Sequence, residues 1–134
     1  MKKAFTMVEL IFVIVVLGIL AMVALPRLAG SKKDAEITRA KAEIAAIRSA
    51  IQTYRGANLL SQKPGSGYPE DLKTTTIEEI TNGTKLGKNW TVKDDGSELY
   101  LTIGNRTATF TYNSTTGRFT CPNTNDLCRK IERN

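Results

Sequence analysis

The sequence contains no histidine, only two cysteines (Cys121 and Cys128), and no glycine-rich phosphate-binding motif. Without histidine there is no Ser-His or Cys-His nucleophile pair and no imidazole ligand for a metal ion. The acidic pairs are sequence neighbours, whose side chains diverge in a strand or cap a turn; they are Glu70-Asp71, Glu78-Glu79 and Asp94-Asp95. The sequence therefore does not predict an enzyme.

The excess of positive over negative charge is also small for a protein that binds nucleic acid. The formal net charge is +6, and Lys2 and Lys3 at the N-terminus supply two of these charges. A balance of this size does not by itself indicate a nucleic-acid partner. The alternative of a DNA-uptake subunit stays open, and its candidate contacts are Lys85, Lys88, Lys93, Arg106, Arg118, Arg129, Lys130 and Arg133.

One long apolar run is present, residues 5–25, with Glu9 as its single charge. A helix of that length rises about 1.5 Å per residue and spans the roughly 30 Å hydrocarbon core of a bilayer. A cleaved secretory signal fits poorly, because the run is too long and the small residues 29–31 lie beyond Pro26 and Arg27. The run predicts a membrane-spanning helix.

Glu9 is costly in this place, since an ionised carboxylate in lipid costs roughly 2.5 to 3.5 kcal/mol. Two interpretations are open. The side chain can extend from the start of the helix toward the headgroups, or it can meet a positive charge that another molecule supplies.

Gly18 and Pro26 weaken the same helix. Glycine costs about 1 kcal/mol relative to alanine in a helix interior, and proline removes a backbone hydrogen bond. One interpretation is a kink at Pro26 where the helix leaves the bilayer.

The first residues resemble the type IV pilins and type II secretion pseudopilins. Precursors in that family carry a short basic leader that ends in Gly or Ala, then Phe, a Thr, a Glu as fifth mature residue and an apolar helix. Here the leader is Met1-Lys2-Lys3-Ala4, and the mature part begins Phe5-Thr6-Met7-Val8-Glu9-Leu10. Ala4 stands where Gly is commoner. The resemblance covers residues 1–55.

The resemblance implies cleavage by a prepilin peptidase between Ala4 and Phe5 and N-methylation of Phe5. It implies that Glu9 pairs with the N-terminal amine of a neighbouring subunit, and that the segment from Gly18 to Pro26 can unwind when subunits pack. It further implies a cytoplasmic N-terminus, an exported head and an inner-membrane assembly platform as partner. The product would be a pilus or a periplasmic pseudopilus, built from this subunit or together with minor pilins.

Residues 28–55 continue the helix with one apolar seam. Its members recur at alternating spacings of three and four, and they are Ile37, Ala40, Ile44, Ile47, Ile51 and Tyr54. A coiled coil is the alternative, but the seam lasts under three heptads. We expect a sheet to pack on this face and the helix to end at Arg55, with Gly56 as its cap.

Turn residues and short apolar runs fill the remainder. Residues 68–72 (Tyr-Pro-Glu-Asp-Leu) can open a short helix. Threonine- and aromatic-rich runs then predict an antiparallel meander of strands at residues 90–93, 98–103, 106–112 and 117–121. The sequence thus predicts an α+β, pilin-like fold, in which a long N-terminal helix packs its second half on a small sheet of about three to four strands.

Cys121 and Cys128 are expected to form a disulfide in an exported domain, closing a loop worth roughly 2 to 3 kcal/mol. A metal site at the two cysteines lacks further ligands. Asp94 and Asp95 are weak candidates for calcium, because major pseudopilins bind it in a C-terminal loop; a solvated hairpin turn is the simpler interpretation.

The expected organisation has four parts: a cleaved leader (1–4), a transmembrane assembly helix (5–27), an amphipathic helix (28–55) and an exported head (56–134). The predicted function is a structural subunit of a membrane-anchored helical filament. The alternatives are the DNA-uptake subunit and an unrelated single-pass membrane protein with a small exported domain.

Overall fold

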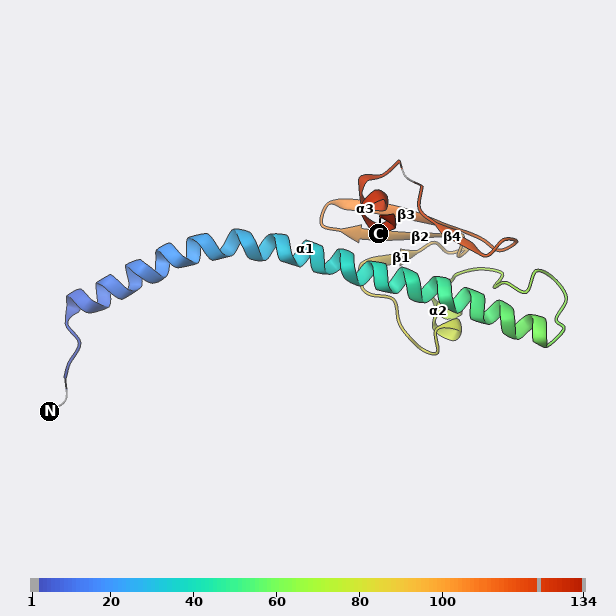
Figure 1. Ribbon diagram of the computed structural model, residues 1–134, viewed down its shortest axis with the longest axis horizontal. Helices are drawn as coiled ribbons and strands as arrows, with labels where there is room; N and C mark the ends of the chain where they lie inside the picture. Colours follow the sequence, from blue (N-terminus) through green and yellow to red (C-terminus); the bar gives the residue numbers. More distant parts are fainter. Residues whose placement is uncertain (1–2, 123, 134) are drawn as a thin grey trace. The chain divides into compact units, whose positions relative to one another are not determined.

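The computed structural model describes the chain except residues 1, 2, 123 and 134, and gives only the backbone of residues 25–29. The chain divides into two compact units, Met1–Ala35 and Glu36–Asn134, which we describe one at a time. The helix α1 (Met7–Leu60) contributes to both (Figure 1).

Unit 1 consists mainly of the apolar first part of α1. The window Met7–Ala24 has a mean hydropathy of 2.9, none of it is buried, and it is the one helical segment among the described residues that is long and apolar enough to cross a membrane. Leucine, isoleucine, valine and phenylalanine side chains therefore face outward on every side of this segment. Such a surface needs a covering of lipid or protein.

The core of unit 2 forms where the predicted seam of α1 meets the sheet. Ala40, Ile44, Ile47 and Ile51 are each at most 2% exposed and belong to one cluster with the inward side chains of the strands. The 3.6-residue period of the seam is thus confirmed as the buried face of the helix.

The sheet is an antiparallel meander in the order β1-β2-β3-β4. Its strands are β1 (Trp90–Val92), β2 (Glu98–Ile103), β3 (Arg106–Asn113) and β4 (Arg118–Thr120), within two residues of the predicted bounds at each end. In β2 and β3 buried and outward residues alternate, as the period of two requires, so that Leu99 faces Phe110 and Leu101 faces Ala108 across the sheet. The predicted α+β fold is confirmed.

The end of α1 differs from the prediction. The helix does not stop at Arg55 but continues through Gly56 to Leu60. It ends in a Schellman motif: the amide of Lys63 donates to the carbonyl of Asn58, and that of Gln62 to Leu59, with Gln62 at φ 52°. Gly56 costs the helix some stability but leaves its hydrogen bonds intact, so a later left-handed residue terminates it.

The short helix also begins later than predicted. Residues 68–73 are not helical, and α2 spans Thr74–Ile80. Asp71 lies just before it, where one carboxylate oxygen accepts from the Lys73 amide and the Thr76 hydroxyl. The last element, α3 (Asp126–Glu132), was not predicted, and Asn125 caps it by accepting from the Leu127 amide.

Candidate functional site

The predicted assembly residue Glu9 lies in the first turn of α1 and is bound there by Thr6. The carboxylate oxygen Oε2 of Glu9 accepts from the Thr6 amide at 3.1 Å and from the Thr6 hydroxyl at 3.2 Å. The Glu9 amide in turn donates to the Thr6 hydroxyl oxygen at 3.2 Å. This reciprocal arrangement is a capping box, with Thr6 as N-cap and Glu9 three residues later.

The capping box fixes where the carboxylate sits. It holds Glu9 beside the amides that begin α1, where the helix dipole favours negative charge. Phe5 directly precedes the N-cap and is 87% exposed. The capping role of Thr6 was not predicted, although the Thr-x-x-Glu spacing is itself the signal for this cap.

Gly18 and Pro26 were predicted to weaken the apolar helix, and the structure describes the surroundings of Gly18 but not the side chain of Pro26. At Gly18 nothing lies within 4 Å of the position a Cβ would take, so the site is open to a neighbouring chain. The side chain of Pro26 lies outside the described residues, and α1 is helical along its backbone there.

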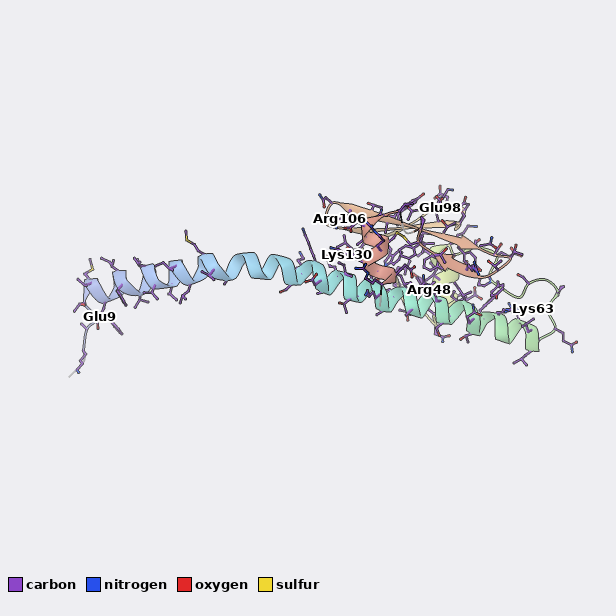
Figure 2. The ribbon with its side chains drawn as sticks, turned by 45° about the horizontal axis from the view of Figure 1, so that its top comes forward. Glu9, Arg48, Lys63, Glu98, Arg106 and Lys130 are labelled. Carbon is purple, nitrogen blue, oxygen red and sulfur yellow. A yellow bond between two sulfur atoms is a disulfide. The ribbon has the colours of Figure 1, made fainter. Side chains whose placement is uncertain are left out.

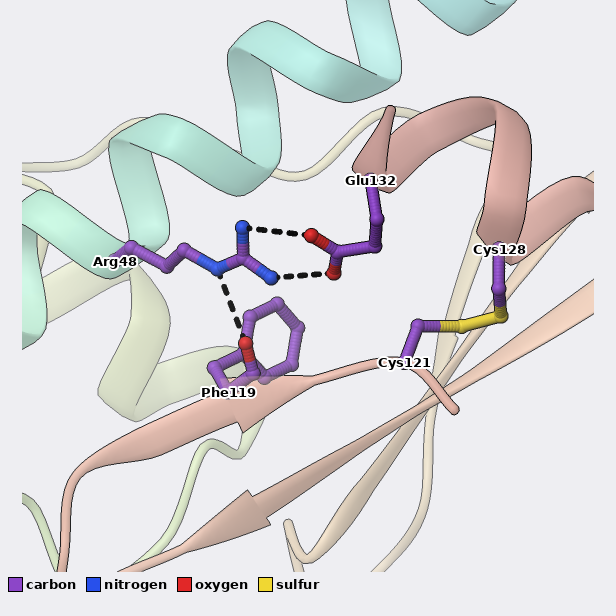
Figure 3. A network of polar contacts seen from close by, with 5 residues as sticks. All are labelled: Arg48, Phe119, Cys121, Cys128 and Glu132. Carbon is purple, nitrogen blue, oxygen red and sulfur yellow. Dashed lines mark hydrogen bonds and ion pairs between the residues drawn. A yellow bond between two sulfur atoms is a disulfide. The ribbon is translucent and has the colours of Figure 1, made fainter. Parts of the chain in front are cut away.

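In unit 2, Arg48 joins α1 to the C-terminal segment (Figure 3). Its guanidinium makes two hydrogen bonds to the Glu132 carboxylate, the shorter 2.6 Å, and donates from Nε to the Phe119 carbonyl at 3.0 Å. Beside it, Cys121 and Cys128 form a disulfide, and both cysteines are buried. The network therefore fastens β4 and α3 to the helix from two directions.

A second polar contact ties the opposite flank of α1 to β1. Glu43 accepts from Arg39 at 2.9 Å on one oxygen and from the Trp90 indole at 2.6 Å on the other. Gly87 packs so closely that a Cβ there would lie 2.8 Å from the Glu43 carboxylate. The sheet is thus pinned to α1 by directed hydrogen bonds as well as by the apolar core.

The calcium candidates Asp94 and Asp95 lie in the turn between β1 and β2. Asp95 accepts from the amide and hydroxyl of Ser97 and pairs with Lys93, and these hydrogen bonds lower its pKa to about 2. The part of the chain that the structure describes holds no group of three or more histidine, cysteine, aspartate or glutamate side chains suited to a metal ion. The Asp95 carboxylate is therefore engaged by Ser97 and Lys93 within the turn.

Three of the eight basic residues considered for DNA contact are engaged in ion pairs. Lys93 pairs with Asp95 and Glu98, and Arg106 and Arg129 both pair with Asp126. These pairs remove part of the charge that phosphate contacts would need.

Comparison with known proteins gives several relatives. The chain is 30% identical over 112 residues to fimbrial protein Q of Moraxella bovis, covering 78% of this chain and 71% of the relative. It is 28% identical over 106 residues to a fimbrial protein of Pseudomonas aeruginosa, covering 77% and 69%. It is also 35% identical over 79 residues to the type II secretion system core protein G of Escherichia coli strain K12, covering 59% and 54%.

No family model and no solved structure matches the chain. The similarities to fimbrial and secretion proteins extend well beyond the apolar helix, which excludes an unrelated single-pass membrane protein. These similarities also identify the protein as a structural, non-enzymatic filament subunit. Together with the exposed apolar helix and the four-stranded sheet, they show that the chain belongs to the type IV pilin and type II secretion pseudopilin family.

Proposed function

We propose that the protein is anchored in the bacterial inner membrane by residues 5–27, with its head exported, and is then transferred into a helical filament through the same helix. In this proposal a prepilin peptidase removes residues 1–4 by cleavage between Ala4 and Phe5. The new amine of Phe5, N-methylated, pairs with Glu9 of a neighbouring subunit. An inner-membrane assembly platform carries out the transfer.

The observation that carries the proposal is the position of Glu9. Its carboxylate is held in the first turn of an apolar helix that has no buried side chain between Met7 and Ala24. A carboxylate and an amine that are both buried when subunits pack each need the other, since an unpaired buried charge costs several kcal/mol. The pairing would therefore select one register between neighbouring helices.

The remaining parts of the chain have roles that follow from this arrangement. Residues 28–55 and the head from 56 to 134 form the exported domain, and the segment from Gly18 to Pro26 unwinds when subunits pack. The open surroundings of Gly18 support close approach of a neighbouring helix. The chain matches both fimbrial proteins and type II secretion core proteins, and the proposal applies to a subunit of either class.

The test replaces Glu9 and leaves the membrane anchor unchanged. We expect Glu9→Ala to be inserted and processed normally but to form no filaments, because the neighbour's amine is left unpaired. Glu9→Gln should assemble poorly as well, since it keeps the hydrogen bonds but not the charge. Glu36→Ala, a matched removal of an acidic residue farther along α1, should assemble as the unmodified protein does.

Electron microscopy of sheared filaments gives the assembly readout, and mass spectrometry of the N-terminal peptide gives the processing readout. Normal filaments from Glu9→Ala would contradict the pairing. A mature N-terminus other than Phe5 would contradict the cleavage.

A further inference from the structure

A group of basic side chains gathers at the end of unit 2 where α1 enters it. The sheet register places Arg106 there, because β3 starts at this end beside Ile103, and β1 starts at Trp90 opposite Leu101. Lys88 and Glu36, the first residue of the unit, line the same small cavity. Lys41 donates to the backbone carbonyl of Arg133 at 2.7 Å, which brings the end of α3 to the same place.

We name this the basal surface, and its basic members are Lys41, Lys88, Arg106, Arg129, Lys130 and Arg133. Figure 2 shows Arg106 and Lys130 at this end of the unit, and Glu98 and Lys63 toward the other end. The opposite end carries the acidic residues Glu70, Asp71, Asp94, Asp95 and Glu98, whose charge is largely offset by Lys63, Lys73, Lys93 and Arg118. Unit 2 therefore has more unbalanced positive charge at the basal surface than at the opposite end.

Two acidic groups near the basal surface are already paired, and Glu36 beside Lys88 adds one further negative charge. Asp126 pairs with Arg106 and Arg129, and Glu132 with Arg48. Lys88, Lys130 and Arg133 are exposed, and their side chains make no ion pair with any residue that the structure describes. The basal surface therefore carries a net positive charge, which favours the binding of an anionic partner.

We propose that the basal surface binds the headgroups of anionic phospholipids while the subunit is held in the membrane. This inference rests on the membrane-anchored stage of the proposed function. Each basic side chain close to an anionic bilayer strengthens binding by about fivefold. The surface thus suits a leaflet of negatively charged lipids better than a soluble acidic ligand, because it lies at the end of the unit to which the anchor is attached.

The chain length allows this contact. Only eleven residues, 25–35, join the apolar segment to Glu36, the first residue of the unit that carries the basal surface. Attraction between exposed charges extends about 8 Å at physiological salt, so it does not require direct contact with the phosphates. The connection is therefore short enough in sequence for a membrane-anchored subunit to present its basal lysines and arginines to lipid headgroups.

The experiment uses the mature full-length protein in nanodiscs of phosphatidylcholine, either alone or mixed with phosphatidylglycerol. Amide hydrogen exchange is measured in the segments 104–106 and 126–133. We expect exchange to be slower by about fivefold or more in the nanodiscs that contain phosphatidylglycerol. High salt should restore the phosphatidylcholine rate, because it screens surface charges.

Two matched double variants locate the effect. Lys88→Glu with Lys130→Glu reverses two basal charges and should abolish the protection. Lys63→Glu with Arg118→Glu reverses two exposed charges at the far end of the unit and should retain it.

Three results would overturn the inference: equal exchange in both lipids, equal loss of protection in both double variants, or protection by added duplex DNA without protection by phosphatidylglycerol. The last would assign the surface to nucleic acid. Failure to co-elute with nanodiscs of either kind would instead refute the membrane anchoring of the proposed function.

Discussion

Thr6 and Glu9 show how one side chain can take part in two arrangements at different stages. In the single subunit Glu9 closes a capping box with Thr6, and in the proposed filament the same carboxylate meets a neighbour's amine. The two roles are separable, because Thr6 contributes only to the first.

We therefore expect Thr6→Ala to loosen the first turn of α1 and to leave filaments intact. Loss of an N-cap costs about 1 kcal/mol, so exchange of the Glu9 and Leu10 amides should accelerate about fivefold. Hydrogen exchange of the protein in detergent micelles measures this, and Thr6→Ser, which keeps the hydroxyl, is the control. Unchanged exchange in Thr6→Ala would show that the cap does not hold the turn.

Ser97 sets the ionisation of Asp95. Its hydroxyl and amide both donate to the Asp95 carboxylate and lower the pKa from 3.8 to about 2. Because the pKa is lower in the folded chain, ionised Asp95 favours folding at pH values above 3.8, and that contribution is lost as the pH falls toward 2.

Ser97→Ala should raise the pKa of Asp95 toward its ordinary value and remove this acid-sensitive contribution. A carboxyl titration followed by nuclear magnetic resonance measures the pKa directly. Ser97→Thr keeps the hydroxyl and should titrate as the unmodified protein does. Identical titration curves for the alanine and threonine variants would refute the assignment to the hydroxyl.

The end of α1 can be tested at the scale of elements, because it was predicted at Arg55, with Gly56 as the cap, and lies at Leu60. Gly56 is in a helix interior with nothing within 4 Å of its would-be Cβ. Gly56→Ala should therefore raise the free energy of unfolding of the head by up to about 1 kcal/mol. If Gly56 were instead a left-handed helix cap, Gly56→Ala would lower the free energy of unfolding.

Gly117→Ala is the matched comparison for that change. Gly117 has φ 67°, and a Cβ there would overlap the Tyr68 ring, so this variant should be destabilised. Near-ultraviolet circular dichroism on heating, in detergent micelles, follows both variants. Equal behaviour of the two would contradict the helix end seen in the structure.

The attachment of α3 depends on covalent and non-covalent contacts together. The disulfide joins Cys121 to Cys128. Leu127 and Ile131 are side chains of α3 that are buried in the core, and Glu132 of the same helix pairs with Arg48. Replacing both cysteines by serine should lower the free energy of unfolding by about 2 to 3 kcal/mol. We expect α3 to stay docked in that variant, because the other contacts remain.

Adding Glu132→Gln to the double cysteine variant should undock α3. Hydrogen exchange in residues 126–132 is the measurement, and Glu132→Gln with the disulfide intact is the control. Rapid exchange already in the variant that lacks only the cysteines would show that the disulfide alone holds the helix.

At the scale of the whole molecule, the long periodic patterns and the four strands were predictable, whereas the start of α2 and the presence of α3 were not. The seam from Ala40 to Ile51 and the alternation in β2 and β3 follow from burial on one face, which the sequence displays directly. α3 has only seven residues, and its position depends on the contact between Glu132 and Arg48, which are 84 residues apart in the sequence. The start of α2 likewise depends on Asp71, whose role as a local acceptor the Tyr-Pro pattern does not reveal.

The division into two units predicts how much of the chain folds without the anchor. All of the buried apolar cluster belongs to Glu36–Asn134, and its first fully buried member is Ala40.

We therefore expect a fragment of residues 36–134, produced in an oxidising compartment, to fold as a soluble domain with the same sheet and disulfide. A fragment of residues 49–134 lacks Ala40, Ile44 and Ile47, and each lost isoleucine removes roughly 1.5 to 3 kcal/mol of apolar burial. It also lacks Arg48, so α3 loses its ion pair. Because a small domain has only a few kcal/mol to lose, the shorter fragment should be unfolded, as judged by amide dispersion in nuclear magnetic resonance spectra. Dispersed spectra from the shorter fragment, or collapsed spectra from the longer one, would show that α1 contributes differently to the head than its buried seam indicates.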